Sequence, residues 1–494
     1  MATSLTKRTS HARLSMMAVA LLCAGCAVGP DYHRPALPAA DNYTRESLPK
    51  TVGAADVSHD EQQLQPGEKI AKEWWTTFGS PQLNALVTQA FAHNPSIESA
   101  QAALRQAQEN VAAQRGAYLP TVQLNYSASR QKNAVGTISP TLTSGQPIYT
   151  LHTTQLNISY APDVFGLNRR AVESLAAQAE SQQFQLEAAY QTLASNVVAA
   201  AVQEAALRAQ IDATTDIIAS DTRSLAILHG QAKLGYASGL DVAAQETALA
   251  QAKQTLPPLQ KQLEQTRDLI AVLTGNLPSQ GGSESFDLDH LQLPREVPLS
   301  LPSQLVERRP DVRAAEAQVH AANAQVGVAL ANRLPQFSIS GQYGGSSTQF
   351  SRMFDQGNKF WGLTGNVAQT IFDFGTLKHR QRAAEAALQQ SAAQYRGVVL
   401  TAFQNVADAL YALDADARAL DAAIQAETAA KRTLDLTRKQ LEFGQVNGLA
   451  LLNAQTAYQQ TRMASVQAQA ARYSDTAALM LALGGGWQEQ QKQE

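Results

Sequence analysis

Two long stretches, residues 168–234 and 376–443, contain no proline and almost no glycine, and they limit the possible folds more than any other feature of the sequence. A helix of about 67 residues would be about 100 Å long, at 1.5 Å per residue. Residues spaced by seven form a seam along each stretch: Tyr190, Val197, Glu204 and Ile211 in the first, and Val399, Val406, Leu413 and Leu420 in the second. Because a seven-residue repeat makes helices wrap around their neighbours, the sequence predicts long coiled-coil helices rather than an ordinary globular core.

Each stretch is followed by a glycine-containing turn and a second helical segment, which predicts two helical hairpins. The turn glycines are Gly235 and Gly239 after the first stretch and Gly444 and Gly448 after the second. Pro257 and Pro258 interrupt the first returning helix. We expect a kink or a break there, because proline removes a helical hydrogen bond and clashes with the preceding turn.

The chain also contains an internal duplication. An offset of 215 residues aligns Leu119-Pro120 with Leu334-Pro335, and an offset of 209 aligns Phe165-Gly166 with Phe374-Gly375. We therefore expect two structural repeats. The segment between them is rich in proline, glycine and serine, and it is expected to be a surface linker.

Apolar and polar residues alternate in two segments ahead of each long stretch. Val122, Leu124 and Tyr126 alternate with polar residues, and the same pattern recurs near Ile158 and Ile339. Strands of about ten residues with this pattern are typical of a membrane barrel, and they are equally typical of a half-buried sheet in a soluble protein. The strands alone leave both interpretations open.

The long helices after the strands favour the barrel. Four strands cannot lie in lipid as an open sheet, because the edge backbone groups would lack hydrogen-bond partners, so other copies of the chain must close it. The predicted fold class is therefore α+β: an outer-membrane β-barrel with four strands per chain, continued by a long antiparallel α-helical coiled-coil barrel. Periodicity alone is compatible with two, three or four copies.

The N-terminus has the pattern of an exported lipoprotein. Basic residues precede a short apolar stretch, 14–24, which is too short to anchor the chain in a membrane. Ala24-Gly25 before Cys26 matches a lipobox, with Cys23 where leucine is usual, so we expect a covalent lipid such as palmitate on Cys26. A Cys23-x-x-Cys26 redox pair is the alternative, but it would lie inside an export signal.

The expected domains follow from these features. They are 1–25 for the lipoprotein signal peptide, 26–80 for a lipid-anchored extended segment, 81–275 for the first repeat, 276–302 for the linker, 303–484 for the second repeat and 485–494 for a C-terminal tail.

Composition excludes several classes of protein. Charged residues are only 16%, yet the mean hydropathy is −0.23, so the chain lacks the repeated apolar runs of a polytopic helical membrane protein. Lys and Arg number 39 against 42 Asp and Glu, which argues against a nucleic-acid partner. The sequence has no phosphate-binding loop and no H-E-x-x-H. Asp373-Phe374-Gly375 spells the kinase triplet DFG without its companions, and it marks a strand-to-helix corner. We predict no catalytic residue, no metal site and no cofactor other than the lipid, and hence no enzyme.

Several strings carry a specific resemblance. They are Gly29-Pro30-Asp31-Tyr32 after Cys26, Trp74-Trp75, Arg308-Arg309-Pro310-Asp311-Val312 and Leu483-Gly484-Gly485-Gly486-Trp487. The chain resembles the TolC-type outer-membrane efflux family, and its RND-pump-associated (NodT-like) lipoprotein branch in particular. The resemblance implies a homotrimer closing a twelve-strand barrel and a twelve-helix tunnel in the outer membrane. It also implies a periplasmic adaptor (membrane fusion) protein and an inner-membrane RND transporter as partners.

The resemblance further implies a gate at the helical tips. In the family, the second returning helix carries a leucine ring and then an acidic ring, and the matching positions here are Leu449 and Asn453. Because the usual Asp is an Asn, we expect weaker focusing of cations at the mouth. On the first returning helix, Asp241 is an acidic residue that could line the tip. It also lies at capping-box spacing from Ser238, so lining of the tip and capping of the helix are both open.

The function predicted from these features is a passive duct that exports small molecules, such as drugs, toxic organic compounds or metal ions, from a pump to the exterior. One alternative is the outer-membrane duct of a type I protein secretion system. Another is a structural envelope lipoprotein that does not conduct. The sequence does not specify the substrate, because a wide water-filled duct selects little.

Overall fold

The computed structural model describes residues 27–36, 42–46, 51–53, 61–68, 70–132, 148–281 and 285–485. The chain divides into two compact units, and the longest helices contribute residues to both. The first unit comprises the chain up to Pro35 with 104–181 and 315–395, and the second comprises 36–103, 182–314 and 396–494. The predicted signal peptide and Cys26 lie outside the described residues, as do the last nine positions of the chain.

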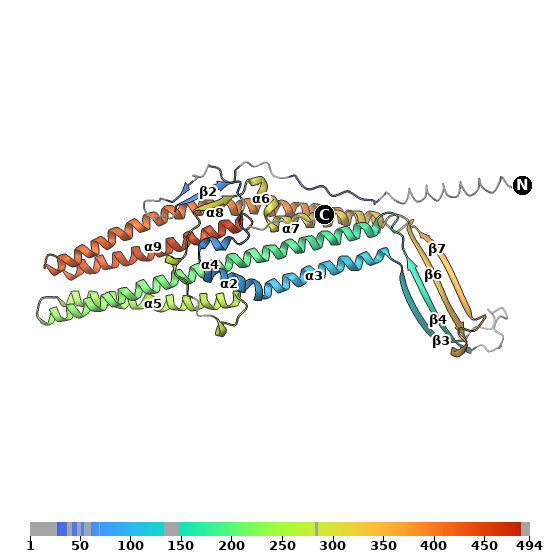
Figure 1. The fold of residues 1–494 in the computed structure, drawn as a ribbon, viewed down its shortest axis with the longest axis horizontal. Helices are drawn as coiled ribbons and strands as arrows, with labels where there is room; N and C mark the ends of the chain where they lie inside the picture. The colour runs from blue at the N-terminus through green and yellow to red at the C-terminus, as the bar shows by residue number, and fades with distance from the viewer. Residues whose placement is uncertain are drawn as a thin grey trace. The chain divides into compact units, whose positions relative to one another are not determined.

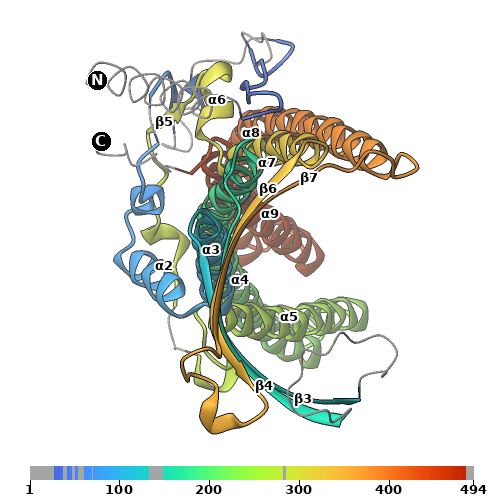
Figure 2. The same cartoon turned by 90° about the vertical axis from the view of Figure 1, so that its right-hand side faces the viewer.

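The first unit contains a four-stranded antiparallel sheet. Its strands are β3 (Thr121–Lys132), β4 (Ile148–Tyr160), β6 (Gln336–Ser347) and β7 (Lys359–Ala368), in the spatial order β3-β4-β6-β7. The alternating segments thus form the four predicted strands, two from each repeat. Figure 2 shows the sheet as a curved strip, with β3 at one edge and β7 at the other.

The register of this sheet places apolar and polar side chains on opposite faces. One cross-strand row consists of Leu124, Leu156, Tyr343 and Trp361. The adjacent row points to the other face and consists of Gln123, Asn157, Gln342 and Gly362. Trp361 is 79% exposed and Leu124 is 72% exposed in the single chain. One face of the sheet therefore suits an apolar environment and the other suits water.

Two very long helices begin directly after the strand pairs. α4 (Leu167–Lys233) and α8 (Thr376–Glu442) have 67 residues each, as the proline-free stretches predicted. Each is followed by a short turn and an antiparallel helix of 35 residues, α5 (Gly239–Leu273) or α9 (Gly448–Ala482), so each repeat forms a helical hairpin (Figure 1). Val197 and Glu204 of the predicted seam are buried in α4. The seam of α8 is buried at Val399, Val406, Leu413 and Leu420.

The paired prolines do not break the first returning helix, so the expectation of a break is wrong. α5 runs without interruption through Pro257 and Pro258. Two prolines remove only two backbone donors from this long helix, and buried residues on either side, Ala252 and Leu263, hold it against its neighbours. The Thr255 hydroxyl donates to the carbonyl of Ala252, 2.8 Å away, just before the prolines.

The linker between the repeats is partly exposed and partly ordered into secondary structure. Its residues Glu296–Leu299 form β5, which pairs in parallel with β2 (Gln62–Pro66). β1 (Thr51–Val52) pairs with the other edge of β2. Phe286 and Val297 are buried. The N-terminal segment, expected to be an extended tether, therefore supplies two strands of a small sheet that the linker completes.

Buried polar side chains connect this small sheet to its surroundings within the second unit. The amide of Gln62 donates to the carbonyl of Pro294 at 3.0 Å. Arg472 of α9 is fully buried and donates to the carbonyls of Leu413 in α8 and Val52 in β1, the latter at 3.2 Å. Because buried polar groups are costly unless they are paired, these contacts fix the position of the sheet.

The other helices of the described chain are shorter. They are η1 (Trp74–Phe78), α2 (Pro81–His93), α3 (Pro95–Arg115), η2 (Gly116–Tyr118), η4 (Pro278–Gln280), η5 (Leu288–His290), α6 (Pro302–Arg308), α7 (Pro310–Ala331) and η6 (Phe350–Arg352). The Ser80 hydroxyl caps α2 by accepting from the N–H of Leu83 at 3.2 Å. None of the helices in the described residues combines the length and apolar character needed to cross a membrane.

Candidate functional site

The two helical hairpins turn at glycines with left-handed backbone. φ is +80° at Gly235 and +71° at Gly444, a region that glycine enters without steric cost. In each turn the next N–H bonds the carbonyl five residues before it, at 2.9 Å, as in a Schellman helix end. The other two predicted turn glycines, Gly239 and Gly448, are the first residues of α5 and α9.

A capping box starts the first returning helix. The hydroxyl of Ser238 accepts from the N–H of Asp241 at 3.2 Å, and the carboxylate of Asp241 accepts from the N–H and the hydroxyl of Ser238 at 3.1 and 2.7 Å. These hydrogen bonds hold the pKa of Asp241 below its usual value, so the carboxylate stays ionised at neutral pH. At the second tip, the side chain of Asn447 accepts from the N–H of Ala450 at 3.1 Å. The capping role proposed for Asp241 is therefore present in the structure.

The predicted gate residues lie on the first two turns of α9. Leu449 is 46% exposed, and Asn453, one turn later, is also exposed. Gly448 lies against α4, since a Cβ at this position would be 3.3 Å from a methyl of Leu228. The start of α9 and the end of α4 therefore lie against each other. Further large apolar side chains are exposed around both turns: Leu234, Tyr236, Leu240 and Phe443.

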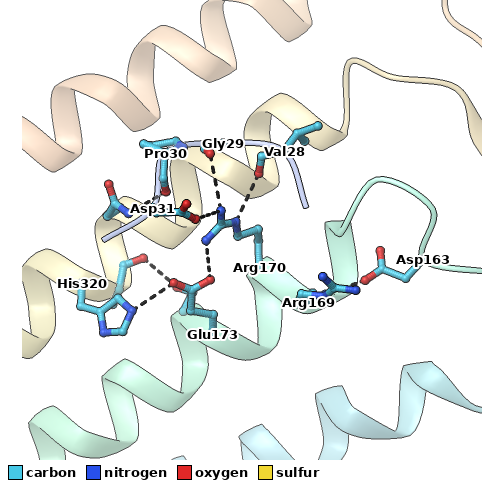
Figure 3. A network of polar contacts seen from close by, with 12 residues as sticks. Val28, Gly29, Pro30, Asp31, Asp163, Arg169, Arg170, Glu173 and His320 are labelled. Atoms are coloured by element: carbon cyan, nitrogen blue, oxygen red, sulfur yellow. Dashed lines mark hydrogen bonds and ion pairs between the residues drawn. The ribbon is translucent and has the colours of Figure 1, made fainter. Parts of the chain in front are cut away.

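A second candidate site is the N-terminal strap, which we define as residues 28–34. Arg170 near the start of α4 is 5% exposed, and its guanidinium is surrounded by acceptors (Figure 3). It donates to the carbonyl of Val28 at 3.2 Å and to the carboxylates of Asp31 and Glu173 at 2.8 Å each. The guanidinium beside Asp31 lowers the pKa of that carboxyl. The buried guanidinium of Arg170 thus holds the strap through Val28 and Asp31, while Glu173 of the same helix orients it.

The rest of the strap lies on α7. The ring of Tyr32 stacks on His320 with centroids 4.3 Å apart, and His320 contacts Glu173 at 3.0 Å. Arg34 forms an ion pair with Glu316 at 3.0 Å. Gly29 packs so closely on α7 that a Cβ would lie 2.5 Å from the Cα of a glycine in that helix. The strap is therefore docked along two helices immediately after the predicted lipid position.

Sequence reasoning missed the role of Arg170. The Gly29-Pro30-Asp31-Tyr32 string was visible, but only as a part of the family resemblance. Arg170 stands 139 positions after Asp31, and two of its acceptors are backbone carbonyls that no side-chain pattern reveals.

Two carboxylates in the second unit, the buried Glu204 and the half-buried Asp475, are also unusual. Glu204 accepts from the N–H of Phe286 at 3.0 Å and from Arg267 at 3.4 Å, which attaches the linker to α4. Burial raises the pKa of Glu204. In α9, burial and the neighbouring carboxyl of Asp416 raise the pKa of Asp475 to about 7. Within the described residues, no three His, Cys, Asp or Glu side chains gather in a way that could hold a metal ion.

Comparison with known proteins identifies relatives of this architecture. A family model described as outer membrane efflux protein matches residues 86–276 and 301–485. The chain is 29% identical to the pyoverdine export outer membrane protein OpmQ of Pseudomonas aeruginosa, over 84% of this chain and 88% of that one. It is 26% identical to the cation efflux system protein CusC of Escherichia coli, over 97% of this chain and 100% of that one.

A solved structure has the same fold. The outer-membrane channel OprN superposes with a TM-score of 0.82 at 26% sequence identity, over 94% of this chain and 100% of that one.

Proposed function

The chain belongs to the outer membrane efflux protein family, and we propose that three copies of it form the passive duct of a tripartite efflux system. It is an outer-membrane component of efflux, and the proposal concerns how it assembles, what it conducts and what it binds. The observation that carries the proposal is the four-stranded sheet with one apolar and one polar face.

The sheet has the dimensions of a membrane-crossing structure. Its strands are 10 to 13 residues long, and a tilted strand of about 9–11 residues crosses the hydrocarbon core. The row through Trp361 and Leu124 would face lipid, and the row through Gln123 and Gln342 would face water. Both faces are then satisfied at once, whereas in a soluble domain the apolar row, exposed at Leu124 and Trp361, would need another layer to cover it.

The outer strands leave edges that a neighbouring copy can pair. β3 and β7 have hydrogen-bonded neighbours on one side only within the described chain. In hydrocarbon, each unpaired N–H or C=O group of these strands would cost roughly several kcal/mol. Further copies of the chain are therefore required to close the sheet into a barrel. Three copies would give twelve strands and, from the two hairpins of each chain, twelve helices.

The helical part supports a periplasmic extension. Each of the two 67-residue helices is about 100 Å long. The exposed apolar side chains at the hairpin turns, among them Tyr236 and Phe443, are the surface on which we place a periplasmic adaptor protein. The energy for transport would come from an inner-membrane RND transporter below the adaptor.

The tips also hold the proposed resting gate. We assign the constriction to Leu449, whose half-exposed side chain would meet its counterparts from the other copies. Asn453 would add amides rather than charges one turn further along, so the mouth would attract cations weakly. The lipid on Cys26, ahead of the docked strap, would anchor each copy to the membrane.

The relatives support a duct that leaves substrate choice to the pump. Proteins of similar identity to this chain are named for pyoverdine export, toluene efflux and cation efflux. These substrates share little chemistry, so we propose small molecules as the cargo and assign no narrower class.

Planar-bilayer recording of the purified protein tests the proposal. Reconstituted protein should give discrete conductance steps, and the protein should be isolated from cells together with an adaptor and an RND transporter. Protein that inserts without conducting would indicate a structural lipoprotein instead. Isolation with an ABC exporter would indicate a protein-secretion duct.

A further inference from the structure

A pocket of about 450 Å³ lies among α4, α5 and α9 in the second unit. Its apolar lining includes Ile217 from α4, Ala252 from α5 and Met463 from α9. Its polar lining includes the amides of Gln251 and Gln459. A volume of this size falls within the range of small-molecule sites, which are typically apolar with a few fixed polar groups.

One carboxylate in this pocket lacks a full set of partners. Asp221 of α4 is only 2% exposed, and its Oδ1 atom has no hydrogen-bond partner among the described residues. The amides of Gln245 and Gln459 approach the carboxylate, but burial has the larger effect and raises the pKa of Asp221. An ionised carboxylate that is buried without a cation is costly, since neither water nor an opposite charge stabilises it.

The neighbouring charges do not supply that cation. Asp216, further toward the N-terminus of α4, is the carboxylate that Arg462 approaches, at 3.9 Å. Within the described part of the chain, no lysine, arginine or histidine forms an ion pair with Asp221. The pocket thus combines a buried acceptor, neutral amides and apolar walls.

We propose that this pocket binds an organic monocation, whose ammonium or iminium group pairs with Asp221 while its apolar part contacts Ile217 and Met463. A divalent metal ion fits the lining less well, because calcium and magnesium prefer several carboxylate or carbonyl oxygens and the lining contains a single carboxylate. The amides of Gln251 and Gln459 can hydrogen-bond the polar substituents of such a ligand. This site adds to the proposed function and does not depend on conduction.

Ethidium, a fluorescent organic monocation, tests the proposal with the full-length protein in detergent. Its binding, followed by fluorescence anisotropy, should be at least tenfold weaker in Asp221→Asn, which removes the charge and keeps the side-chain shape. The matched control is Asp212→Asn, which removes an exposed carboxylate from the same helix and should leave binding within twofold of the original. The neutral dye N-phenyl-1-naphthylamine should not respond to Asp221→Asn.

A second variant keeps the test decisive if Asp221→Asn folds poorly. Ala464 lines the pocket and is exposed, so Ala464→Trp should fill the pocket and weaken ethidium binding while leaving the carboxylate in place. Equal ethidium affinity in the original protein and both pocket variants would overturn the proposal. Displacement of ethidium by millimolar potassium or magnesium at constant ionic strength would also overturn it, because the site would then belong to an inorganic cation. Unchanged bilayer conductance in these variants would leave the duct assignment intact in either case.

Discussion

Asp163 and Asp373 cap the two longest helices from positions that are not equivalent in the internal repeat. Asp163 accepts from the N–H groups of Asn168 and Arg169 at 3.0 and 2.8 Å. Asp373 accepts from those of Gly375 and Leu377 at 2.9 and 2.7 Å. The offset of 209 that aligns the flanking Phe-Gly pairs leaves the two carboxylates one position apart. In each repeat, an Asp side chain at the strand-to-helix corner therefore accepts hydrogen bonds from backbone N–H groups that the helix itself leaves without partners.

Removing either cap should destabilise its corner. Asp163→Ala and Asp373→Ala should each lower the melting temperature of the protein, because each variant loses a side chain that caps a long helix. Thermal unfolding followed by circular dichroism measures the change. Asp355→Ala, which removes an exposed acid from the loop between β6 and β7, is the matched control and should have no effect. Equal stability of all three variants would show that the two caps contribute nothing.

Arg170 should control the docking of the strap. Arg170→Met removes hydrogen bonds to a carbonyl and to two carboxylates, and the bonds to the carboxylates are charge-assisted and therefore stronger than neutral ones. We expect chymotrypsin to cut after Tyr32 several times faster in this variant, because the ring would leave its stack on His320. Mass spectrometry of the shortened chain gives the rate. Arg169→Met, which changes the exposed neighbour, should be cut like the original protein, and an equally slow cut in Arg170→Met would contradict the assignment.

Leu449 should set the resting conductance of the duct. Leu449→Ser replaces a half-exposed apolar side chain at the start of α9 with a small polar one, so the single-channel conductance in a planar bilayer should rise. Asn453→Asp, one turn away, is the companion variant. It should increase block by divalent cations, because it adds carboxylates, while leaving the size of the conductance steps nearly unchanged. Conductance that is identical in Leu449→Ser and the original protein would place the gate elsewhere.

The carboxyl pair of Asp475 and Asp416 should make the second unit sensitive to pH. The pKa of Asp475 rises from the ordinary 3.8 to about 7, chiefly through burial. A carboxyl with a raised pKa in the folded state contributes its full stability below pH 3.8, and it loses that stability as pH rises through about 7. The protein should therefore become less stable between about pH 4 and pH 7, and ionised Asp475 would repel Asp416 above that range.

Asp475→Asn should abolish this dependence. At pH 8 we expect the variant to be more stable than the original protein by about 1–2 kcal/mol, after allowing for screening by solvent. At pH 4 the two proteins should unfold at the same temperature. Asp435→Asn, which removes an exposed carboxylate from α8, is the control and should shift neither value. A difference of the same size at both pH values would rule out titration as its cause.

Much of the fold could be predicted from the sequence, because its signals are local. The absence of proline from 168–234 predicted α4 within one residue at each end, and strict alternation around Leu124 and Ile339 predicted the strands. The expectation of a helix break at Pro257 was wrong because it considered only the proline residues themselves. The cost of missing donors depends on how the helix packs, and that packing is contributed by residues far away in the chain.

The sites were less predictable, because they depend on burial and on contacts between distant residues. The capping role of Asp241 was visible, since its partner Ser238 lies three positions away. The importance of Arg170 was not visible, since its acceptors include backbone carbonyls of the strap. Asp221 looks like any other acid on a long helix, and only the packing of α4, α5 and α9 around it creates the pocket.

We propose that one chain supplies part of a cylinder and that three identical chains enclose the channel. Native mass spectrometry of the full-length protein, extracted from membranes in mild detergent, counts the copies. We expect a species containing three copies, with the helical circular dichroism expected for α4, α5, α8 and α9. A stable, fully folded monomer under the same conditions would contradict it.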